Sequence, residues 1–219
     1  MRYIDIHTHT WYEDKDALLL LNVFAHEPNK LELPGYKSVG LHPWHVEEVE
    51  WKKQVVAVEH LAGDPNVIAI GEAGLDKTIA AGYELQNTVF TAQLEIAEKW
   101  NKPMVIHCVR SYSEMLALRK RSRQSVPWIF HWYNADLQTA RELIRKNCFL
   151  SFGHMLFNEK SKAFSAFPEI PSDRIFFETD DAGYTIRQVY EKAASLRKID
   201  LPVLQDQIMD NFARCFQKY

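Results

Sequence analysis

The first apolar segment of the chain carries three polar residues at alternate positions, Asp5, His7 and His9. In an extended strand, alternate side chains point to the same face, so the carboxyl group and the two imidazole rings would lie together. Two imidazoles at this spacing can bind one cation, and imidazole suits zinc, manganese, iron or nickel. A carboxylate beside them can orient a ligating ring through its other nitrogen, a role that we assign to Asp5. His-x-His also arises by accident, so the motif needs support from other parts of the chain.

Further polar side chains stand at or just after the ends of short apolar runs. They are His42, Glu72, His107, His131 and Asp180. Glycines on both sides of Glu72 allow close approach of the backbone, and the two oxygens of its carboxyl group can bridge two cations. Each of these residues alone has an ordinary structural or surface role as its alternative. Because function in a (β/α) barrel gathers where the strands end, the whole set, with His7 and His9, predicts a metal site.

The elements that would position these residues alternate along the chain. Short apolar runs that predict strands are separated by longer amphipathic runs that predict helices. The predicted strands are Tyr3 to His7, Ala17 to Phe24, Ser38 to Leu41, Val67 to Ile70, Met104 to His107, Trp128 to His131, Phe149 to Phe152 and Ile175 to Glu178. The predicted helices are Glu47 to Leu61, Leu85 to Trp100, Ser113 to Arg123, Leu137 to Lys146 and Leu204 to Phe216. Eight strands with crossover helices predict an α/β fold, a (β/α)8 TIM barrel.

The first third of the chain fits this barrel less well. Only about ten residues separate the first two predicted strands, and about as many separate the next two, which is less than a helical crossover needs. A barrel of this kind typically takes about 250 residues, and the chain has 219. We therefore expect one domain over residues 1–219, with a barrel that is shortened or irregular in its first third.

Composition and charge narrow the class of protein. The formal net charge of -3 lacks the basic surplus of a tight nucleic-acid-binding domain, although a nucleic-acid substrate is allowed. Three cysteines, Cys108, Cys148 and Cys215, have the spacing of neither a zinc knuckle nor a disulfide framework. Without a signal-peptide pattern or a long apolar run, we expect a cytoplasmic protein with no membrane span. The sequence indicates no obligate protein partner and leaves the oligomeric state open.

Taken together, the motifs resemble those of the TatD family of metal-dependent hydrolases, within the amidohydrolase-like barrels. The motifs that carry the resemblance are Asp5-Ile6-His7-Thr8-His9, Gly40-Leu41-His42-Pro43, Gly71-Glu72-Ala73-Gly74-Leu75-Asp76, Pro103-Met104-Val105-Ile106-His107-Cys108-Val109-Arg110, Ile129-Phe130-His131-Trp132 and Phe177-Glu178-Thr179-Asp180. Each motif is weak alone, and their order and approximate spacing make the set specific. The chain departs from the family in the loop after Asp180, which lacks the usual proline, and in the short segment between His9 and His42.

The resemblance implies divalent cations at the strand ends, two in number, with zinc, magnesium or manganese as candidates. Glu72 would bridge the two cations. The implied ligands are His7, His9, Glu72 and Asp180 for one cation, and Glu72, His107 and His131 for the other.

The family is associated with phosphodiester hydrolysis, notably of DNA, so the resemblance implies a deoxyribonuclease or a related phosphodiesterase. A metal-activated water would attack phosphorus in line. Asp180 could accept the proton of that water, and His42 and Arg110 are suited to contacting the phosphate. The same frame also suits a hydrolase of a small ester, lactone or amide, or a metal-binding scaffold without catalysis.

Two other features allow contact with nucleic acid. The basic cluster from Arg119 to Arg123 could bind a phosphate backbone, although the negative pole at the end of a helix also favours such a cluster. Several aromatic residues just beyond strand ends could stack on bases or pack locally. They are Trp11, Trp44, Trp132, Tyr133 and Tyr184. Cys108 should face away from the metal site, because it is the neighbour of His107 on a strand.

Overall fold

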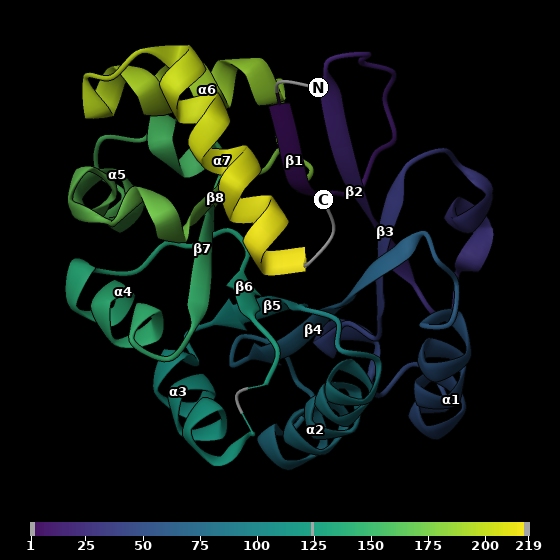
Figure 1. The fold of residues 1–219 in the computed structure, drawn as a ribbon. Coiled ribbons are helices and arrows are strands. Elements are labelled where there is room, and N and C mark those ends of the chain that lie inside the picture. The colour runs from purple at the N-terminus through teal and green to yellow at the C-terminus, as the bar shows by residue number, and fades with distance from the viewer. Residues whose placement is uncertain (1–2, 124, 217–219) are drawn as a thin grey trace.

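Eight parallel strands, paired in chain order from β1 to β8, form one sheet that curls into a nearly closed barrel (Figure 1). The structure is a computed structural model that describes residues 3–123 and 125–216. The strands are β1 (Tyr3–Thr8), β2 (Ala17–Phe24), β3 (Tyr36–Gly40), β4 (Val67–Asp76), β5 (Met104–Val109), β6 (Trp128–Phe130), β7 (Cys148–Phe152) and β8 (Ile175–Phe177). The (β/α)8 fold is therefore confirmed. The predicted domain of residues 1–219 also includes both ends and Gln124, which lie outside the described residues.

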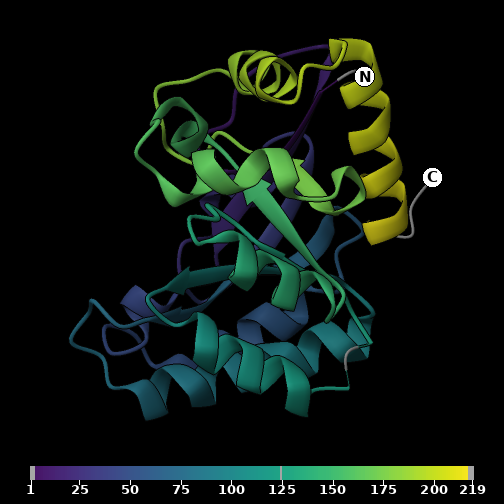
Figure 2. The ribbon, with the colours of Figure 1, turned by 90° about the vertical axis from the view of Figure 1, so that its left-hand side faces the viewer.

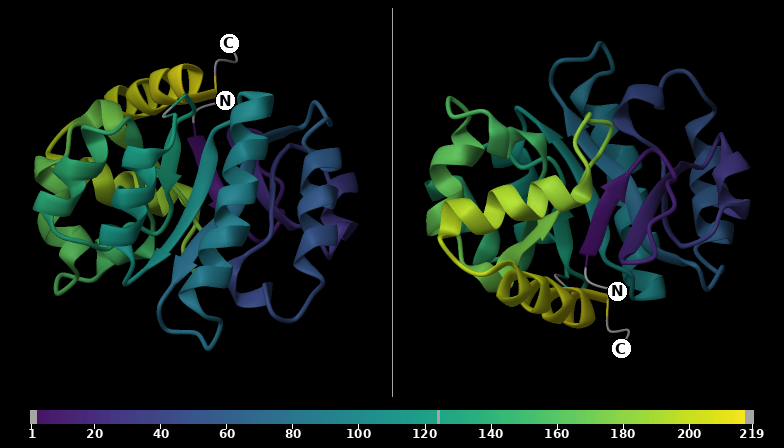
Figure 3. Two further views of the ribbon diagram at one scale, coloured as in Figure 1. Left: turned by 90° about the horizontal axis from the view of Figure 1, so that it is seen from below. Right: turned by 90° about the horizontal axis from the view of Figure 1, so that it is seen from above.

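Helices cover the outside of the barrel from β3 onwards, as the side view in Figure 2 shows. The α-helices are α1 (Trp51–Leu61), α2 (Tyr83–Trp100), α3 (Tyr112–Arg121), α4 (Leu137–Ile144), α5 (Lys162–Ala166), α6 (Ile186–Arg197) and α7 (Leu201–Phe216). Short 3-10 helices lie in the connecting segments: η1 (Pro28–Glu32), η2 (Pro43–His45), η3 (His154–Phe157), η4 (Phe167–Glu169) and η5 (Ser172–Arg174). Figure 3 shows α6 and α7 side by side against β1. No α-helix in the described part of the chain is both long and apolar enough to cross a membrane.

The first third of the barrel has reduced connections, as predicted. Within the described chain, no helix lies between β1 and β2, and only η1 lies between β2 and β3, on the right of Figure 1. The loop between β1 and β2 is attached to α6 instead. The Arg187 guanidinium donates hydrogen bonds to Asp14 Oδ1 (2.8 Å) and Oδ2 (3.1 Å), and to Asp16 Oδ2 (3.2 Å).

Strand β4 is longer than predicted and continues past Ile70 to Asp76, buried along its whole length. Two glycines let it run close to β5. Gly71 has a φ of +136°, and a Cβ atom at Gly71 or Gly74 would overlap the β5 backbone at Val105 or His107. Only glycine tolerates both the positive φ and this close approach. The extension places Glu72 on the strand itself, inside the barrel.

The barrel closes where the last strand meets the first. Asp180 and Thr8 form a parallel bridge. The Asp180 N–H donates to the His7 carbonyl (2.9 Å), and the His9 N–H donates to the Asp180 carbonyl (3.2 Å). This closure fixes the backbone of Asp180 between the two histidines of β1.

Candidate metal centre

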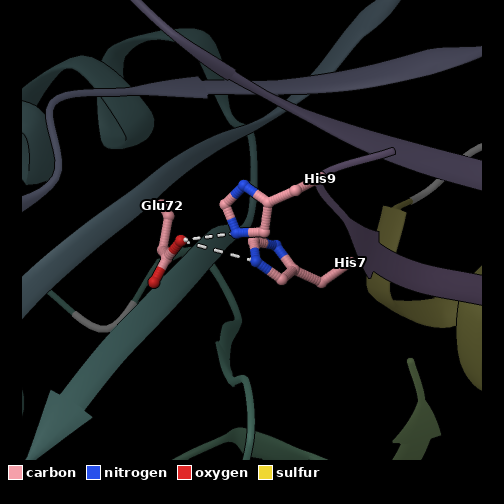
Figure 4. Close-up of side chains that lie close together, drawn as sticks. All are labelled: His7, His9 and Glu72. Atoms are coloured by element: carbon pink, nitrogen blue, oxygen red, sulfur yellow. Dashed lines mark ion pairs between the residues drawn. The ribbon is translucent and has the colours of Figure 1, made fainter. Parts of the chain in front are cut away.

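Five imidazole rings surround the buried carboxyl group of Glu72 at the carboxyl ends of the strands. Glu72 Oε2 lies 3.4 Å from Nε2 of His7 and 3.5 Å from Nε2 of His9, and Figure 4 shows both rings turned toward it. Oε1 faces the other three rings. Its neighbours are His107 Nδ1 at 2.7 Å, His131 Nε2 at 2.7 Å and His42 Nε2 at 3.1 Å. The two oxygens of one carboxyl group are therefore nearest to different imidazoles, although the His7 and His131 rings of the two sets are in contact, with centroids 4.4 Å apart.

Asp180 joins the set on the Oε2 side. Its Oδ1 lies 3.5 Å from Nε2 of His7 and 3.2 Å from Nε2 of His9. Three groups in the described chain offer ligand atoms within 4.8 Å of one another: His7, His9 and Glu72; His7, His131 and Asp180; and His42, Glu72 and His107. The fold thus brings together all seven polar residues that were predicted to lie at the strand ends: His7, His9, His42, Glu72, His107, His131 and Asp180.

The donor set fits a divalent cation. Both ring nitrogens of His7 and Nδ1 of His131 are buried without a hydrogen bond. Buried polar atoms without partners cost free energy, and a cation between such nitrogens and the carboxylates would supply the missing contacts. Imidazole nitrogens and carboxylate oxygens are also the usual ligands of zinc and manganese.

The charges of the cluster compensate one another without an ion. Burial raises the pKa of Glu72, but the neighbouring His131 and His42 outweigh it and hold that pKa well below its usual value. Burial lowers the pKa of His9 and His131, and their contacts with Glu72 and with Asp180 outweigh it and raise both pKa values to about 9. A cation that binds His9 and His131 would therefore have to displace their protons.

Asp5 differs from its predicted role. Its carboxyl group accepts hydrogen bonds from the Tyr12 hydroxyl (2.8 Å), the Thr179 N–H (2.9 Å) and the Thr179 hydroxyl (2.7 Å), and from no imidazole ring among the described residues. Burial raises the pKa of Asp5 to about 6 despite these hydrogen bonds. Asp5 thus holds the residue before Asp180 and supports the barrel closure.

Two residues near the centre had no predicted role. Asp76 Oδ2 accepts a hydrogen bond from the Trp44 indole (2.8 Å) and lies 3.2 Å from Nε2 of His107. Asn22 Oδ1 accepts the Glu72 N–H (3.0 Å). Both left a signal in the sequence: Asp76 shares a strand face with Glu72, and Asn22 interrupts an apolar run.

Arg110 lies outside the cluster. It follows β5, is exposed and has a φ of +53°, and no contact joins it to the other site residues in the described chain. The structure therefore brings His42, but not Arg110, to the centre.

The basic cluster from Arg119 to Arg123 does not face the centre. Arg119 is fully buried, with its guanidinium 4.9 Å from the Trp128 ring centroid and its Nε donating to the Lys146 carbonyl (2.8 Å). Because α3 starts at the rim and returns to the start of β6, this cluster lies at the opposite end of the barrel. The buried Arg119 is therefore not available to a phosphate, and contact of Lys120, Arg121 and Arg123 with a nucleic-acid backbone stays a prediction.

The aromatic candidates separate into exposed and packed residues. Trp44, Trp132 and Tyr184 are 56%, 41% and 38% exposed. Tyr133 is fully buried and donates its hydroxyl to the Asp136 carbonyl (2.7 Å), so it is a packing residue. Trp11 lines a cavity of about 570 Å³ on the outside of β2, which no residue of the cluster lines. Cys108 is partly buried and packs against the hydrophobic core.

The chain is similar in sequence to a known protein family and to individual proteins. The sequence profile of the family described as TatD related DNase matches residues 25–217. An uncharacterized metal-dependent hydrolase, YabD, of Bacillus subtilis (strain 168) is 27% identical over 199 residues, which cover 83% of this chain and 77% of that protein. The 3'-5' ssDNA/RNA exonuclease TatD of Cronobacter turicensis is 30% identical over 168 residues, which cover 74% of this chain and 63% of that protein.

Solved structures show the same fold. The TatD homologue YJJV from Escherichia coli K12 superposes with a TM-score of 0.85 at 19% identity, over 100% of this chain and 99% of that one. A TatD family hydrolase from Entamoeba histolytica gives a TM-score of 0.80 at 13% identity, over 98% of both chains. The family profile begins after His7 and His9 and does not include this pair.

Proposed function

The chain belongs to the TatD related DNase family of metal-dependent hydrolases, and from this premise we propose that it is a divalent-metal-dependent phosphodiesterase that cleaves DNA. The proposal rests on the position of the Glu72 carboxyl group between the histidines. Its Oε2 lies 3.4 and 3.5 Å from two imidazoles, and its Oε1 lies 2.7 to 3.1 Å from three others. A carboxylate between two sets of nitrogen ligands suits two bridged cations. The exonuclease name of a relative supports a nucleic-acid substrate.

We assign the ligands from the geometry of Glu72. On the Oε2 side, one cation would be held by His7, His9, Glu72 and Asp180, and on the Oε1 side a second would be held by Glu72, His107 and His131. The abundance of imidazole favours zinc or manganese over magnesium, which prefers oxygen ligands. When bound, the cations supply a water nucleophile near neutral pH and screen charge on the phosphoryl oxygens.

His42 is assigned to the substrate rather than to a cation. Its Nδ1 accepts a hydrogen bond from the Trp44 N–H (3.2 Å), so the proton of the neutral ring is on Nε2. Burial lowers the pKa of His42 to about 4, which keeps the ring neutral near pH 7. Nε2 then donates, 3.1 Å from Glu72 Oε1. A fixed N–H donor at this point suits a phosphoryl oxygen and not a metal ion.

Asp180 and Arg110 complete the proposed machinery. Both contacts of the Asp180 carboxyl group with the β1 histidines use Oδ1, which leaves Oδ2 to accept the proton of the attacking water. Arg110, exposed at the end of β5, has a planar fork that matches a phosphate of the bound strand. We also propose that the protein works in the cytoplasm, which three free cysteines support.

The test compares phosphodiesters with carboxyl esters. Protein freed of metal by a chelator is given manganese, zinc or magnesium, and the hydrolysis of bis(p-nitrophenyl) phosphate, single-stranded DNA and p-nitrophenyl acetate is measured. We expect metal-dependent cleavage of both phosphodiesters. Cleavage of the carboxyl ester alone would indicate a small-ester hydrolase, and full metal binding without turnover would indicate a scaffold; either result would contradict the proposal.

A further inference from the structure

Trp44 is an exposed tryptophan that hydrogen bonds fix in place beside the metal centre. Its side chain is 56% exposed, on η2 just after β3. The backbone N–H donates to His42 Nδ1 (3.2 Å), and the indole N–H donates to Asp76 Oδ2 (2.8 Å). The ring stands edge-on to the His42 ring, with the centroids 4.9 Å apart and an angle of 88° between the planes. The orientation of the indole is therefore set before any ligand binds.

The same contacts place the indole over the Oε1 side of the centre. The Trp44 ring centroid is 6.1 Å from that of His107, and the His42 and His107 rings are 4.3 Å apart. Both histidines are buried, with 3% and 5% of their surface exposed. The aromatic surface of Trp44 that faces solvent thus lies next to the position assigned to the scissile phosphate.

Exposure alone would not set Trp44 apart, because single exposed apolar residues are ordinary on soluble proteins. Trp100 is 40% exposed at the end of α2, where Lys102 Nζ lies 5.7 Å from its ring centroid, and it has no contact with the centre in the described chain. Trp44 differs because its indole N–H is bonded to the carboxyl group that also faces His107. Fixing a large side chain in advance lowers the entropy cost of binding a flat ligand on it.

Arg110 at the end of β5 is the cation that we assign to a phosphate on this side of the rim. Lys77, just beyond the end of β4, is paired with Glu114. The net charge of the chain is -3. Besides contacts of cations with phosphates, stacking on an aromatic ring is a general source of affinity for single strands.

We propose that Trp44 is the stacking platform for the nucleobase next to the scissile phosphate, so that cleavage depends on a base with an accessible face beside that phosphate. This inference rests on the proposed function. In a duplex, the terminal base is paired with the opposite strand and stacked on its neighbour, so its face is less available to an indole. In a single strand, an unpaired base can stack on the face of the indole while the adjoining phosphate lies next to His42.

The experiment uses two short single strands that differ only in their terminal nucleotides. One strand carries bases throughout, and in the other both terminal nucleotides are tetrahydrofuran abasic analogues. The manganese-loaded protein is expected to cleave the base-bearing strand at least about tenfold more efficiently in kcat/KM. Trp44→Ala should lower the rate on the base-bearing strand to that on the abasic strand, and Trp44→Phe should keep part of the preference. Trp100→Ala, which removes a similarly exposed tryptophan, should keep all of it.

Equal cleavage of both strands by the unchanged protein, or a preference that survives Trp44→Ala, would overturn the proposal. So would an equal loss on the abasic strand, because Trp44 would then act through Asp76 and His107. Metal content and circular dichroism of each variant exclude misfolding.

A second measurement does not need turnover: a thymidine dinucleotide should quench tryptophan fluorescence, and Trp44→Phe, but not Trp100→Phe, should abolish the quenching. Quenching without hydrolysis would contradict the proposed function but leave Trp44 as a base-binding site. Unchanged quenching in Trp44→Phe would contradict the assignment of that site.

Discussion

Asp76 and Glu72 lie on opposite edges of the His107 ring, and Asp76 Oδ2 is 3.2 Å from its Nε2 while Glu72 Oε1 is 2.7 Å from its Nδ1. A carboxylate at the second ring nitrogen fixes the tautomer and the orientation of a ligating imidazole. With a proton held on Nε2 by Asp76, Nδ1 is free to donate its lone pair on the Glu72 side. Asp76 is therefore a positioning residue for His107.

Asp76→Asn should weaken binding of the second cation by about 10- to 100-fold, because an amide holds the ring less firmly than a carboxylate. Binding is measured by titrating metal-free protein with zinc against a chromophoric chelator. The control is Asp64→Asn, which changes an exposed acid at the other end of the barrel. Equal affinities in Asp76→Asn and the parent would show that Asp76 has no such role.

Glu72→Gln should remove at least one of the two cations and lower hydrolysis of bis(p-nitrophenyl) phosphate by at least about a hundredfold. A neutral amide cannot bridge two cations with two anionic oxygens. Metal content is measured by elemental analysis after gel filtration, together with turnover. Glu59→Gln, which changes a surface ion pair with Lys99, is the matched control. Full metal content with full activity in Glu72→Gln would refute the assignment.

His42→Ala should lower kcat by about a hundredfold and leave metal content unchanged, because the ring is assigned as a donor to the substrate. His42→Gln, whose side-chain amide can also donate, should recover part of the loss. Turnover and metal content are compared in the two variants. Loss of a cation from His42→Ala would show instead that His42 is a ligand, as its proximity to Glu72 and His107 also allows.

The strands could be predicted because parallel strands covered on both faces are continuous apolar runs. β4 was predicted to end at Ile70, since glycine and acidic residues are depleted in strands, and Gly71 follows at once. The alternation of Glu72, Gly74 and Asp76 on one face was the signal of its continuation. The seven strand-end residues could be predicted because the barrel topology alone brings strand ends together.

Side-chain contacts between different elements could not be predicted in the same way. The hydrogen bond of Asp76 with Trp44 joins the ends of two strands through side chains, and no spacing along the chain encodes it. Arg119 belongs to a basic run that is typical of a solvated helix end, but Trp128 and the carbonyl of Lys146 make a buried site for it. Helix α6 was not predicted, although Thr185 and Gln188 form a capping box at its start.

Arg187→Met should lower the melting temperature at about pH 7, and the difference from the parent should be smaller at about pH 3. The Arg187 guanidinium holds the pKa of Asp14 below its ordinary value of 3.8. A carboxyl group with a lowered pKa stabilises the folded state above that value and loses the contribution as the pH falls. The melting temperatures are measured by calorimetry at both pH values, with Arg121→Met as the control. A difference of the same size at both pH values would assign the effect to packing of Arg187 on Tyr3, whose ring centroid is 4.8 Å away.

Gly74→Ala should destabilise the fold and the Oε1 side of the metal centre together. Gly74 pairs with His107 across β4 and β5, and an added Cβ would overlap the His107 backbone. The strands must then separate, at a cost of about 1–3 kcal/mol in unfolding free energy, and the ring of His107 moves away from Glu72. Urea unfolding and zinc titration measure the two effects. Gly183→Ala, where a Cβ meets no atom within 4 Å, should change the unfolding free energy by less than about 0.5 kcal/mol. If Gly74→Ala were as stable as Gly183→Ala and bound both cations, the close approach of β4 and β5 would not be what positions His107.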